Sequence, residues 1–389
     1  MRIALLAAED PGWGGIGTYT GVLGAALAEL GHDVQLVLRG WEQDGVETLD
    51  GLTVHRVTVP EPRWRRSTVA ITSRLYVARE SLIFSARAAH VVAEIAADVV
   101  EAPEFHAGGL AASLRARLTL HAPPVVTRLH TPSYLTAQLA AERPDLDLHL
   151  GEALEAVSTH LAKAVTSPSE ALAGAVRHRW RLPAGSVQVM PNPVDDGLFA
   201  PSEHDLEGPG SILVVGRVER LKGQDLLIEA LPAILEAVPE AHLRVVGADG
   251  GTAEQLALRA RELGVSAAVA FEGARARAEL PGTYRSASVC VVPSRFENFP
   301  YTCAEAMACG RPVVAARAGG LAEVVNDGED GLLVEPEDPA SLSAAICGLL
   351  LDADERRRLG RAARERVESA FAARTVAARM VQTYAEVAH

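Results

Sequence analysis

Residues 212–223 read ILVVGRVERLKG, and residues 224–238 continue with apolar side chains at helical spacing. The run Ile212–Val215 is apolar and largely β-branched, which is typical of a buried strand. The glycines and charged residues after it indicate a tight turn into a helix. The stretch therefore predicts one strand–loop–helix unit, the building block of a parallel sheet covered by helices.

The same unit repeats in two series, separated by Met190–Gly197 and the polar stretch Ser202–Gly210. This alternation is typical of doubly wound α/β sheets, and the break between the series predicts a linker. We expect two facing Rossmann-like domains, residues 1–190 and 191–372, with a cleft between them and a C-terminal helix, residues 373–389, that crosses back to the first domain. The expected strands are Arg2–Ala7, Val34–Leu38, Val54–Val57, Val99–Val100, Val125–Leu129, Ile212–Val215, Leu243–Val246, Val269–Phe271, Val289–Val292, Val313–Ala315 and Leu332–Val334.

Composition agrees with a folded protein that has an acidic surface. The 389 residues include 37 Lys+Arg and 50 Asp+Glu, a net charge of −13, and 48% are hydrophobic. A chain this long forms two or three domains of about 150 residues each. The acidic balance excludes a protein that binds nucleic acid or an anionic membrane through a broad positive field. Local basic sites remain compatible with it, and only Lys163 and Lys222 among the basic residues are lysines.

The cysteines and the first residues indicate a compartment. Cys290, Cys303, Cys309 and Cys347 have no C-x-x-C spacing, so they signal neither a zinc site nor a disulfide framework. The apolar start Ile3–Ala8 is shorter than the core of a signal peptide, and no apolar run approaches the about 20 residues of a membrane span. We expect a cytoplasmic monomer or homodimer with no metal site and at most peripheral membrane contact.

A glycine-rich loop follows the first strand. Residues 12–17 read GWGGIG, a literal G-x-G-x-x-G, which lets backbone N–H groups approach an anion at a helix N-terminus. An NAD site also needs an acid at the end of the second strand, where this chain has Arg39, a residue that suits NADP. We interpret Gly14 and Gly15 as part of an approach loop for an anion or a sugar. A tight turn explains the glycines nearly as well.

Two groups of carboxylates in the first domain have competing explanations. Asp145 and Asp147 spell the D-x-D with which one class of sugar transferases holds a metal, but no strand precedes them, and we expect no metal role. Glu101 and Glu104 lie at the end of a strand, where they can contact a hydroxyl or amine of an acceptor. Solvated carboxylates are the simpler explanation of this pair.

Two basic features are equally open. His130 follows the strand Val125–Leu129, where an imidazole facing a cleft can donate a hydrogen bond, although a structural histidine is the usual outcome. Arg63–Arg66 contains three arginines that can contact an anionic acceptor or membrane phosphates. A solvated loop explains that stretch equally well.

The loop after Val215 carries a candidate phosphate site. Arg217 leaves the strand end, and Lys222 stands at the start of the next helix. Both cations and the helix N-terminus can converge on one diphosphate. The glycines Gly216 and Gly223 on either side favour this function over a solvated turn.

The stretch Pro293–Gly310 carries two carboxylates eight positions apart. Glu297 lies in a loop after a strand, and Glu305 lies at the start of the following helix, where both can accept hydrogen bonds from a polyol. Thr302-x-x-Glu305 is also a capping box, in which Glu305 only satisfies an N–H at the helix end. The pattern supports the two interpretations of Glu305 equally.

Taken together, these motifs resemble those of retaining glycosyltransferases of the GT-B fold, glycosyltransferase family 4. The similarity runs through the loop 12–17, Val189–Asp195, Val215–Gly223, Val245–Gly247 and Glu297–Val314, in that order. Several motifs in the same order make coincidence implausible.

The resemblance implies roles for individual residues. Arg217 and Lys222 hold the donor diphosphate, Glu297 contacts the donor sugar, Glu305 binds the ribose, and His130 lies near the sugar's primary hydroxyl. By the same resemblance Glu305 is assigned to the ligand rather than to a helix cap. The other donor residues are Gly15, Gly216, Gly247, Asn298, Phe299 and Pro300. The candidate acceptor residues are Gly15 and His130, which the resemblance implies, together with Gly14 from the glycine loop and Glu104 from the strand end.

The implied reaction moves a hexosyl group from a UDP- or GDP-sugar to a hydroxyl or amine acceptor, without a cofactor or a metal. The family often has Glu-Gly-Phe-Gly where this chain has Glu297-Asn298-Phe299-Pro300, so the donor sugar does not follow from the resemblance. A nucleotide-sugar epimerase of the same fold is the first alternative. An NADP-dependent oxidoreductase rests on the first glycine loop alone, and a non-catalytic binding protein is disfavoured because Arg217, Lys222, Glu297 and Glu305 are all present.

Overall fold

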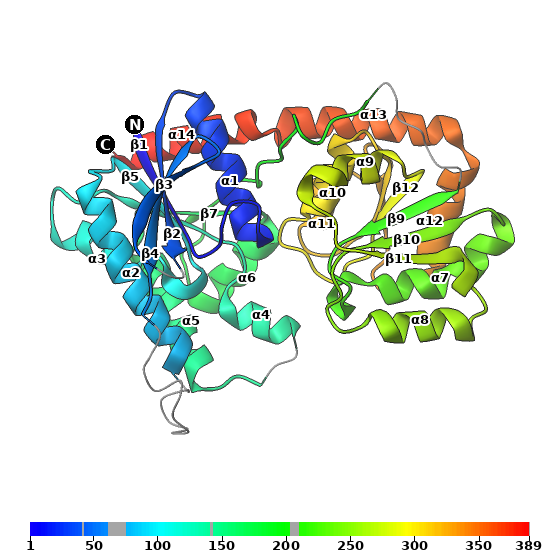
Figure 1. Cartoon of the computed structure of the whole chain (residues 1–389), viewed down its shortest axis with the longest axis horizontal. Helices are drawn as coiled ribbons and strands as arrows, with labels where there is room; N and C mark the ends of the chain where they lie inside the picture. The colour runs from blue at the N-terminus through cyan, green and yellow to red at the C-terminus, as the bar shows by residue number, and fades with distance from the viewer. Residues whose placement is uncertain (41–42, 61–74, 141–142, 203–209, 389) are drawn as a thin grey trace. The chain divides into compact units, whose positions relative to one another are not determined.

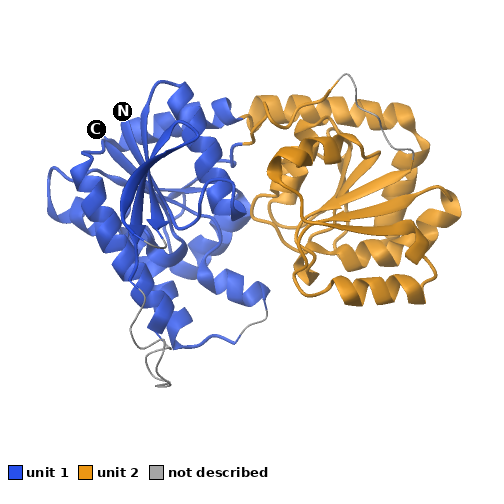
Figure 2. Ribbon diagram, in the orientation of Figure 1, with its two compact units in different colours: residues 1–193, 373–389 blue, residues 194–372 orange. Residues whose placement is uncertain are grey.

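The computed structural model divides into two compact units (Figure 2). Unit 1 comprises Met1–Pro193 together with Ala373–His389, and unit 2 comprises Val194–Ala372. The chain thus leaves unit 1 three residues after the expected boundary and returns to it at residue 373. The structure describes residues 1–40, 43–60, 75–140, 143–202 and 210–388.

Unit 1 is built on a sheet that has eight strands in its described part, in the order β3-β4-β2-β1-β5-β6-β7-β8 (Figure 1). All neighbouring strands pair in parallel except β3, which pairs antiparallel to β4. The strands are β1 (Arg2–Ala7), β2 (Asp33–Gly40), β3 (Gly45–Leu49), β4 (Leu52–Thr58), β5 (Val99–Pro103), β6 (Val125–Arg128), β7 (Ala164–Ser167) and β8 (Val187–Val189). The helices are α1 (Gly14–Glu29), α2 (Tyr76–Glu94), η3 (Phe105–Ala107), α3 (Leu110–Leu118), α4 (Ser133–Leu139), α5 (Leu146–Leu161), α6 (Glu170–Trp180) and α14 (Ala373–Ala388).

The last helix, α14, belongs to the core of unit 1. Val376, Met380 and Tyr384 lie one to two turns apart on one helix face and are completely buried. They pack with residues of β1, β2 and α1 in one hydrophobic cluster, and Figure 1 shows α14 beside α1. Burial of this apolar face holds the end of the chain on unit 1.

Unit 2 has a parallel sheet with the order β11-β10-β9-β12-β13-β14 among its described residues. Its central strands are apolar and buried along nearly their whole length, as parallel strands covered by helices on both faces must be. The strands are β9 (Ser211–Val215), β10 (His242–Val246), β11 (Val269–Gly273), β12 (Val289–Val292), β13 (Val313–Ala316) and β14 (Leu332–Val334). The helices are η4 (Arg220–Lys222), α7 (Gln224–Ala237), α8 (Ala253–Glu262), η5 (Ser266–Ala268), η6 (Arg277–Glu279), α9 (Leu280–Arg285), α10 (Tyr301–Ala308), α11 (Leu321–Val324), α12 (Pro339–Leu351) and α13 (Ala353–Ala370).

Each sheet reverses its strand order at one point. In unit 1 the order reverses between β1 and β5, and in unit 2 it reverses between β9 and β12. Loops at the carboxyl ends of such neighbouring strands open a crevice in which ligands of α/β proteins bind. Ligand-binding residues are therefore expected in the loops after these four strands.

The predicted α/β class and all six strands predicted for unit 2 are confirmed. In unit 1 the sequence missed β3, β7 and β8. β3 is largely exposed, and β7 and β8 are only four and three residues long, so none of them has the long apolar run that marked the others. The arginines of Arg63–Arg66 lie outside the described residues.

Candidate active site

The loop after β9 forms a tight turn that ends at the N-terminus of α7. Gly216 has a φ of 148° and Gly223 a φ of 71°, both in the region that favours glycine. A Cβ on Gly223 would lie 2.0 Å from the carbonyl oxygen of Pro293, in the loop after β12. Glycine at 223 therefore allows the two loops on either side of the reversal point to lie against each other.

Lys222 and Glu297 form an ion pair between these two loops. Lys222 Nζ donates to Glu297 Oε1 at 2.7 Å, and the hydroxyl of Ser294 donates to the same oxygen at 2.8 Å. The side chains of Lys222 and Glu297 are 27% and 12% exposed. The structure thus brings together two residues that the sequence assigned to one site from positions 75 residues apart.

Arg217 lies in the same loop as Lys222 but points to solvent. Its side chain is 66% exposed, and its nearest carboxylate is Glu219, with Nη1 to Oε2 at 3.6 Å. Gln224, the first residue of α7, donates to the carbonyl oxygen of Arg217 at 2.9 Å, so the backbone here is held. The guanidinium is therefore accessible to an anion.

Gly319 and Gly320, which were not predicted as site residues, pack against the backbone of Glu297 and Asn298. The N–H of Gly320 donates to the carbonyl oxygen of Glu297 at 2.7 Å. A Cβ on Gly319 would lie 2.4 Å from that oxygen, and one on Gly320 would lie 2.2 Å from the carbonyl oxygen of Asn298. Their position after β13, at the same edge of the sheet, was the signal available in the sequence.

Arg295 joins the two loops and was also missed. Its N–H donates to the carbonyl oxygen of Leu221 at 2.9 Å, and its Nη1 donates to that of Arg220 at 2.6 Å. The guanidinium binds both oxygens of Asp225, in the first turn of α7, at 2.8 Å each. Arg295 thus fixes the Glu297 loop to the segment that ends in Lys222.

Glu305 faces a different set of partners. Arg277 Nη1 donates to its Oε1 at 2.8 Å, and the hydroxyl of Tyr284 donates to its Oε2 at 3.0 Å. Burial raises the pKa of Glu305, and the Arg277 charge opposes this shift. α10 begins at Tyr301 with Pro300 as its N-cap, so the capping-box interpretation of Thr302 and Glu305 is wrong. Arg277 follows β11 at the same sheet edge, a positional signal that the sequence analysis did not use.

The residues between the two glutamates shape the backbone. The ring of Phe299 is 8% exposed and packs edge-on against Tyr301 and Phe371, at centroid distances of 5.3 and 5.9 Å. The side chain of Phe299 therefore belongs to the hydrophobic core, and any ligand contact at Phe299 would involve its backbone.

Gly247 follows β10, and a Cβ there would lie 1.9 Å from the carbonyl oxygen of Gly216. The close packing of these two loops therefore already requires glycine at 247.

In unit 1 the glycine loop begins α1 at Gly14. Glu9 turns back over this end, and its Oε2 accepts the N–H of Gly17 at 3.2 Å. A Cβ on Gly14 would lie 2.4 Å from that carboxylate, whereas a Cβ on Gly15 would meet nothing within 4 Å. The positive φ of 61° at Gly14 explains the glycine there, while glycine at 15 leaves open space at the helix start.

His130 and Glu104 are in contact, but not as expected of two acceptor ligands. Both carboxylate oxygens of Glu104 accept the backbone N–H of His130 at 2.8 Å, and Glu104 is completely buried. Burial raises its pKa to about 8. The His130 ring packs edge-on against Tyr19 at 5.0 Å and is 9% exposed, and burial holds its pKa well below the usual range. The expectation of a solvated Glu104 is wrong.

A second buried carboxylate lies behind Glu104. Glu155 of α5 accepts the backbone N–H groups of His106 and Ser133 at 3.0 Å each, and also the Ser133 hydroxyl. Burial raises the pKa of Glu155 to about 7, and its charge raises that of Glu104 further. These carboxylates hold the loops after β5 and β6 from inside the domain.

Glu101 is likewise internal rather than solvated. It accepts the hydroxyl of Tyr19 at 2.8 Å and that of Tyr384, in α14, at 2.7 Å. The guanidinium of Arg128 is 1% exposed, stacks over the Tyr19 ring at 4.7 Å and donates to Asn192 at 2.5 Å. Through these contacts Asn192, near the point where the chain leaves unit 1, is held to β6, and the last helix α14 is held to β5. The residues of this cluster come from distant parts of the chain, so no local sequence pattern predicts the cluster.

The remaining motifs of unit 1 have structural roles. Asp145 accepts the N–H of Leu148 at the start of α5, and Asp147 accepts the N–H groups at the start of α2, so the D-x-D caps two helices. Arg39, the residue that an NADP site would use, pairs with Glu80 at 2.8 Å. Within the described ranges, no three His, Cys, Asp or Glu side chains are grouped as a metal site requires.

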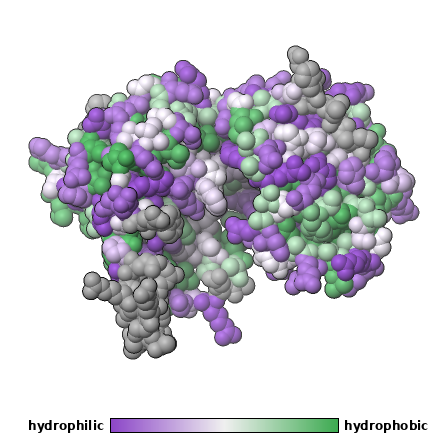
Figure 3. All heavy atoms as spheres, in the orientation of Figure 1, coloured by the Kyte–Doolittle hydropathy of each residue, from purple (hydrophilic) through white to green (hydrophobic). Residues whose placement is uncertain are grey.

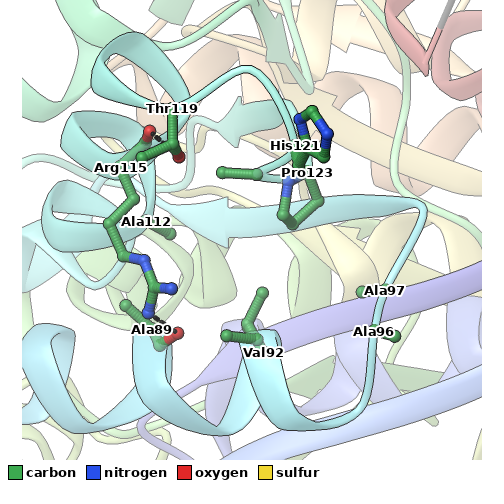
Figure 4. A pocket seen from close by; sticks show the side chains of 11 residues that line it. Ala89, Val92, Ala96, Ala97, Ala112, Arg115, Thr119, His121 and Pro123 are labelled. Carbon is green, nitrogen blue, oxygen red and sulfur yellow. Dashed lines mark hydrogen bonds between the residues drawn. The ribbon is translucent and has the colours of Figure 1, made fainter.

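Two hollows of the described surface lie elsewhere in unit 1. One of about 550 Å³ lies between α2 and α3, lined mainly by alanines, with Arg115, Thr119 and His121 as its polar lining residues (Figure 4). One of about 290 Å³ lies beside His106 and Ser133. On the face drawn in Figure 3, hydrophilic and hydrophobic side chains are interspersed. None of the helices in the described parts of the chain combines the length and the apolar character of a membrane span.

Comparison with known proteins agrees with the predicted family. Residues 200–366 match the family model described as glycosyl transferases group 1, and residues 13–198 match that of glycosyltransferase family 4. A D-inositol 3-phosphate glycosyltransferase of Geodermatophilus obscurus is 32% identical over 393 residues, which cover 94% of this chain and 85% of that protein. The chain belongs to the group 1 glycosyltransferases of family 4. A protein of the same name from Corynebacterium jeikeium is 44% identical over 152 residues, 38% of this chain.

In seven proteins of this name, the segment that this chain matches covers between 34% and 65% of the protein's length. Among solved structures, sucrose-phosphate synthase from Thermosynechococcus elongatus has a TM-score of 0.79 and 26% identity, over 99% of this chain and 98% of that one. Anabaena Alr3699/HepE in complex with UDP-glucose has a TM-score of 0.72 and 21% identity, over 99% and 100%. These similarities confirm the GT-B fold.

Proposed function

We propose that this family 4 protein transfers a hexosyl group from a UDP- or GDP-sugar to a hydroxyl or amine acceptor, with retention of configuration. The observation that carries the proposal is the Lys222–Glu297 ion pair at the reversal point of the unit 2 sheet. It puts a cation suited to a phosphate beside a carboxylate suited to sugar hydroxyls. Similar proteins named inositol-phosphate glycosyltransferases, and a similar structure that holds UDP-glucose, support it.

The proposed reaction needs positive charge where the nucleoside diphosphate leaves. As the bond to the anomeric carbon breaks, negative charge develops on the leaving phosphate and positive charge on the sugar. Lys222, the exposed guanidinium of Arg217 and the N-terminus of α7 supply positive charge that is already in place, which lowers the barrier. We therefore propose turnover without a divalent metal, and expect the rate to be unchanged by EDTA.

Glu297 and Glu305 are both proposed to contact the donor, Glu297 at the sugar and Glu305 at the ribose. A carboxylate has about four lone-pair positions, so Glu305 can accept a ribose hydroxyl while Arg277 and Tyr284 hold its oxygens in place. The Glu305→Gln substitution keeps the shape but removes the charge. It should weaken donor binding about tenfold, because hydrogen bonds to a charged acceptor contribute about 1.5–3 kcal/mol. Equal donor affinity would remove Glu305 from the site.

Unit 1 is proposed to contact the acceptor through the open space at Gly15 and through His130. Glu104 then acts through the His130 backbone and does not touch the acceptor. In the front-face mechanism that the family resemblance implies, the leaving phosphate takes the proton of the acceptor hydroxyl. No separate catalytic base is then required.

The test is a transfer assay with named donors and acceptors. UDP-glucose, UDP-N-acetylglucosamine, GDP-mannose and GDP-glucose would each be incubated with a panel that includes myo-inositol, its phosphates, sugars and amino sugars. The expected result is an α-linked product and free nucleoside diphosphate from one donor. Isomerisation of a nucleotide sugar without transfer would identify an epimerase instead. Binding without either reaction across the panel would contradict the proposal.

A further inference from the structure

The two carboxylate oxygens of Glu297 have different surroundings. Oε1 accepts hydrogen bonds from Lys222 Nζ and from the Ser294 hydroxyl, at 2.7 and 2.8 Å. Oε2 receives no hydrogen bond from any residue that the structure describes. The side chain is nevertheless mostly enclosed, at 12% exposure. One oxygen is therefore satisfied by the protein, and the other is open to a donor from a ligand.

Glu297 is held in place more firmly than Lys222. Its carbonyl oxygen accepts the Gly320 N–H, and its neighbour Arg295 is bonded to the segment before α7. The hydroxyl that bonds Oε1 belongs to Ser294, which is buried. Lys222 is more exposed, and its ammonium stands at the end of a flexible four-carbon stem. An anion that competes for the pair would therefore draw away the lysine and leave the carboxylate where it is.

Such a competition has different consequences for two ligands. A nucleoside diphosphate that takes Lys222 leaves a mostly enclosed carboxylate with one fewer donor and brings like charge close to it, which is unfavourable. A nucleotide sugar takes the same ammonium but supplies hydroxyl donors to the carboxylate in exchange. The sugar thus replaces the hydrogen bonds that the diphosphate removes.

We propose that Glu297 competes with the diphosphate for Lys222 and thereby makes the site select the nucleotide sugar over the nucleoside diphosphate left after transfer. The inference rests on the proposed function and adds to it a device for product release. Because Glu297 opposes the diphosphate alone, the product is held less tightly than the substrate.

Glu297→Gln tests this inference by calorimetry with UDP, UDP-glucose, GDP and GDP-mannose. Glutamine keeps the size of the side chain but no longer neutralises Lys222 or repels phosphate. For the nucleotide that binds, the Kd of the diphosphate should fall about fivefold, and the preference for the nucleotide sugar over the diphosphate should fall at least tenfold. Glu236→Gln, an exposed carboxylate of α7, is the control that removes the same charge from unit 2, and it should leave both affinities within twofold.

Two further variants keep the test decisive. Ser294→Ala removes the other donor to Oε1 and should make the carboxylate depend more on Lys222, so that diphosphate binding weakens two- to threefold. In a Lys222→Ala background, Glu297→Gln should change diphosphate affinity by twofold or less. Unchanged or weaker diphosphate binding by Glu297→Gln would overturn the inference and leave the proposed function standing. Failure of the wild type to bind any of the four nucleotides would overturn the proposed function.

Discussion

Both sheets carry charged residues at the point where the strand order reverses, but these residues are partly exposed in unit 2 and buried in unit 1. In unit 2, charged side chains from two loops meet each other and remain partly exposed, as Lys222 and Glu297 do. In unit 1, the carboxylates Glu101 and Glu104 at the corresponding place are buried and turned toward the protein itself. The sheet order provides a crevice in both units, and among the residues that the structure describes at these two points, the accessible cations lie in unit 2.

The difference teaches that strand-end position alone does not identify a ligand-binding carboxylate. Buried carboxylates with raised pKa values stabilise loops through backbone N–H groups, as Glu104 and Glu155 do. Partly exposed ion pairs between two loops leave oxygens and cations that a ligand can reach. Substitutions in unit 2 should therefore change turnover and ligand affinity, and substitutions in unit 1 carboxylates should chiefly change stability.

The largest expected effect is that of Lys222→Ala on turnover. Removing a cation that stabilises the leaving group costs about 10²–10³ in rate at comparable sites. We expect kcat/KM to fall by about that factor while the melting temperature stays within a few degrees, because the Lys222–Glu297 pair is partly exposed. Lys163→Ala, which removes the other lysine, is the matched control. Equal loss in both variants would break the contrast between the two units.

Arg295→Ala should have the next largest effect, through positioning. The side chain holds the Glu297 loop to the segment that ends in Lys222 by bonds to Arg220 and Asp225. Misplacement of catalytic groups by about 1 Å can cost about 100-fold, so we expect kcat to fall 30- to 100-fold with a smaller change in KM. Arg295→Lys should recover part of the rate. A large loss of stability with unchanged kcat would assign Arg295 a structural role only.

Glu104→Gln should alter the pH dependence of stability. Burial raises the pKa of Glu104 to about 8 from the ordinary 4.5. Between about pH 5 and 8, the folded protein therefore keeps a proton that the unfolded chain has released, and the free energy of unfolding falls as pH rises. Removing Glu104 should flatten this fall by up to about 3.5 kcal/mol, and the slope that remains comes partly from Glu155, whose pKa is also raised. Urea unfolding at pH 5, 6, 7 and 8 measures it; parallel curves for the wild type and the variant would refute the assignment.

Tyr384→Phe should have the smallest effect, and it tests whether the buried cluster of unit 1 affects stability alone. The hydroxyl donates to the buried Glu101 at 2.7 Å and helps to hold α14. Its loss should lower the free energy of unfolding by about 1 kcal/mol. Donor KM should not change, because Tyr384 lies in the core of unit 1. A donor KM that rose severalfold in this variant would place the cluster around Glu101 in the donor site.

Local patterns were enough to predict the fold class and the strands of unit 2, and they gave Lys222 and Glu297 as candidate ligand-binding residues. Short or exposed strands such as β7 and β3 have no such pattern, because their stability depends on neighbours in the sheet. The same limit applies to the site. Arg295 and Arg277 act through contacts with distant segments, and a lone arginine after a strand is indistinguishable in sequence from a solvated one.

The carboxylates show where sequence reasoning fails in the opposite direction. Glu104 and Glu101 occupy strand ends that suit a ligand, yet their orientation is set by burial against α5 and α14, which comes from packing. The capping-box pattern at Thr302 failed because Pro300 starts α10 two residues earlier, which places Glu305 in the second turn. At Gly15, by contrast, a Cβ would meet no neighbouring atom, so packing does not explain why this residue is a glycine.

Hydrogen–deuterium exchange with and without UDP or GDP tests most directly whether the nucleotide binds at the reversal point of unit 2. The nucleotide that raises the melting temperature more would be used at saturation. The account predicts slower exchange in residues 216–223 and 297–305, with no change in residues 99–106 of unit 1. Protection confined to unit 1, with residues 216–223 unaffected, would contradict it.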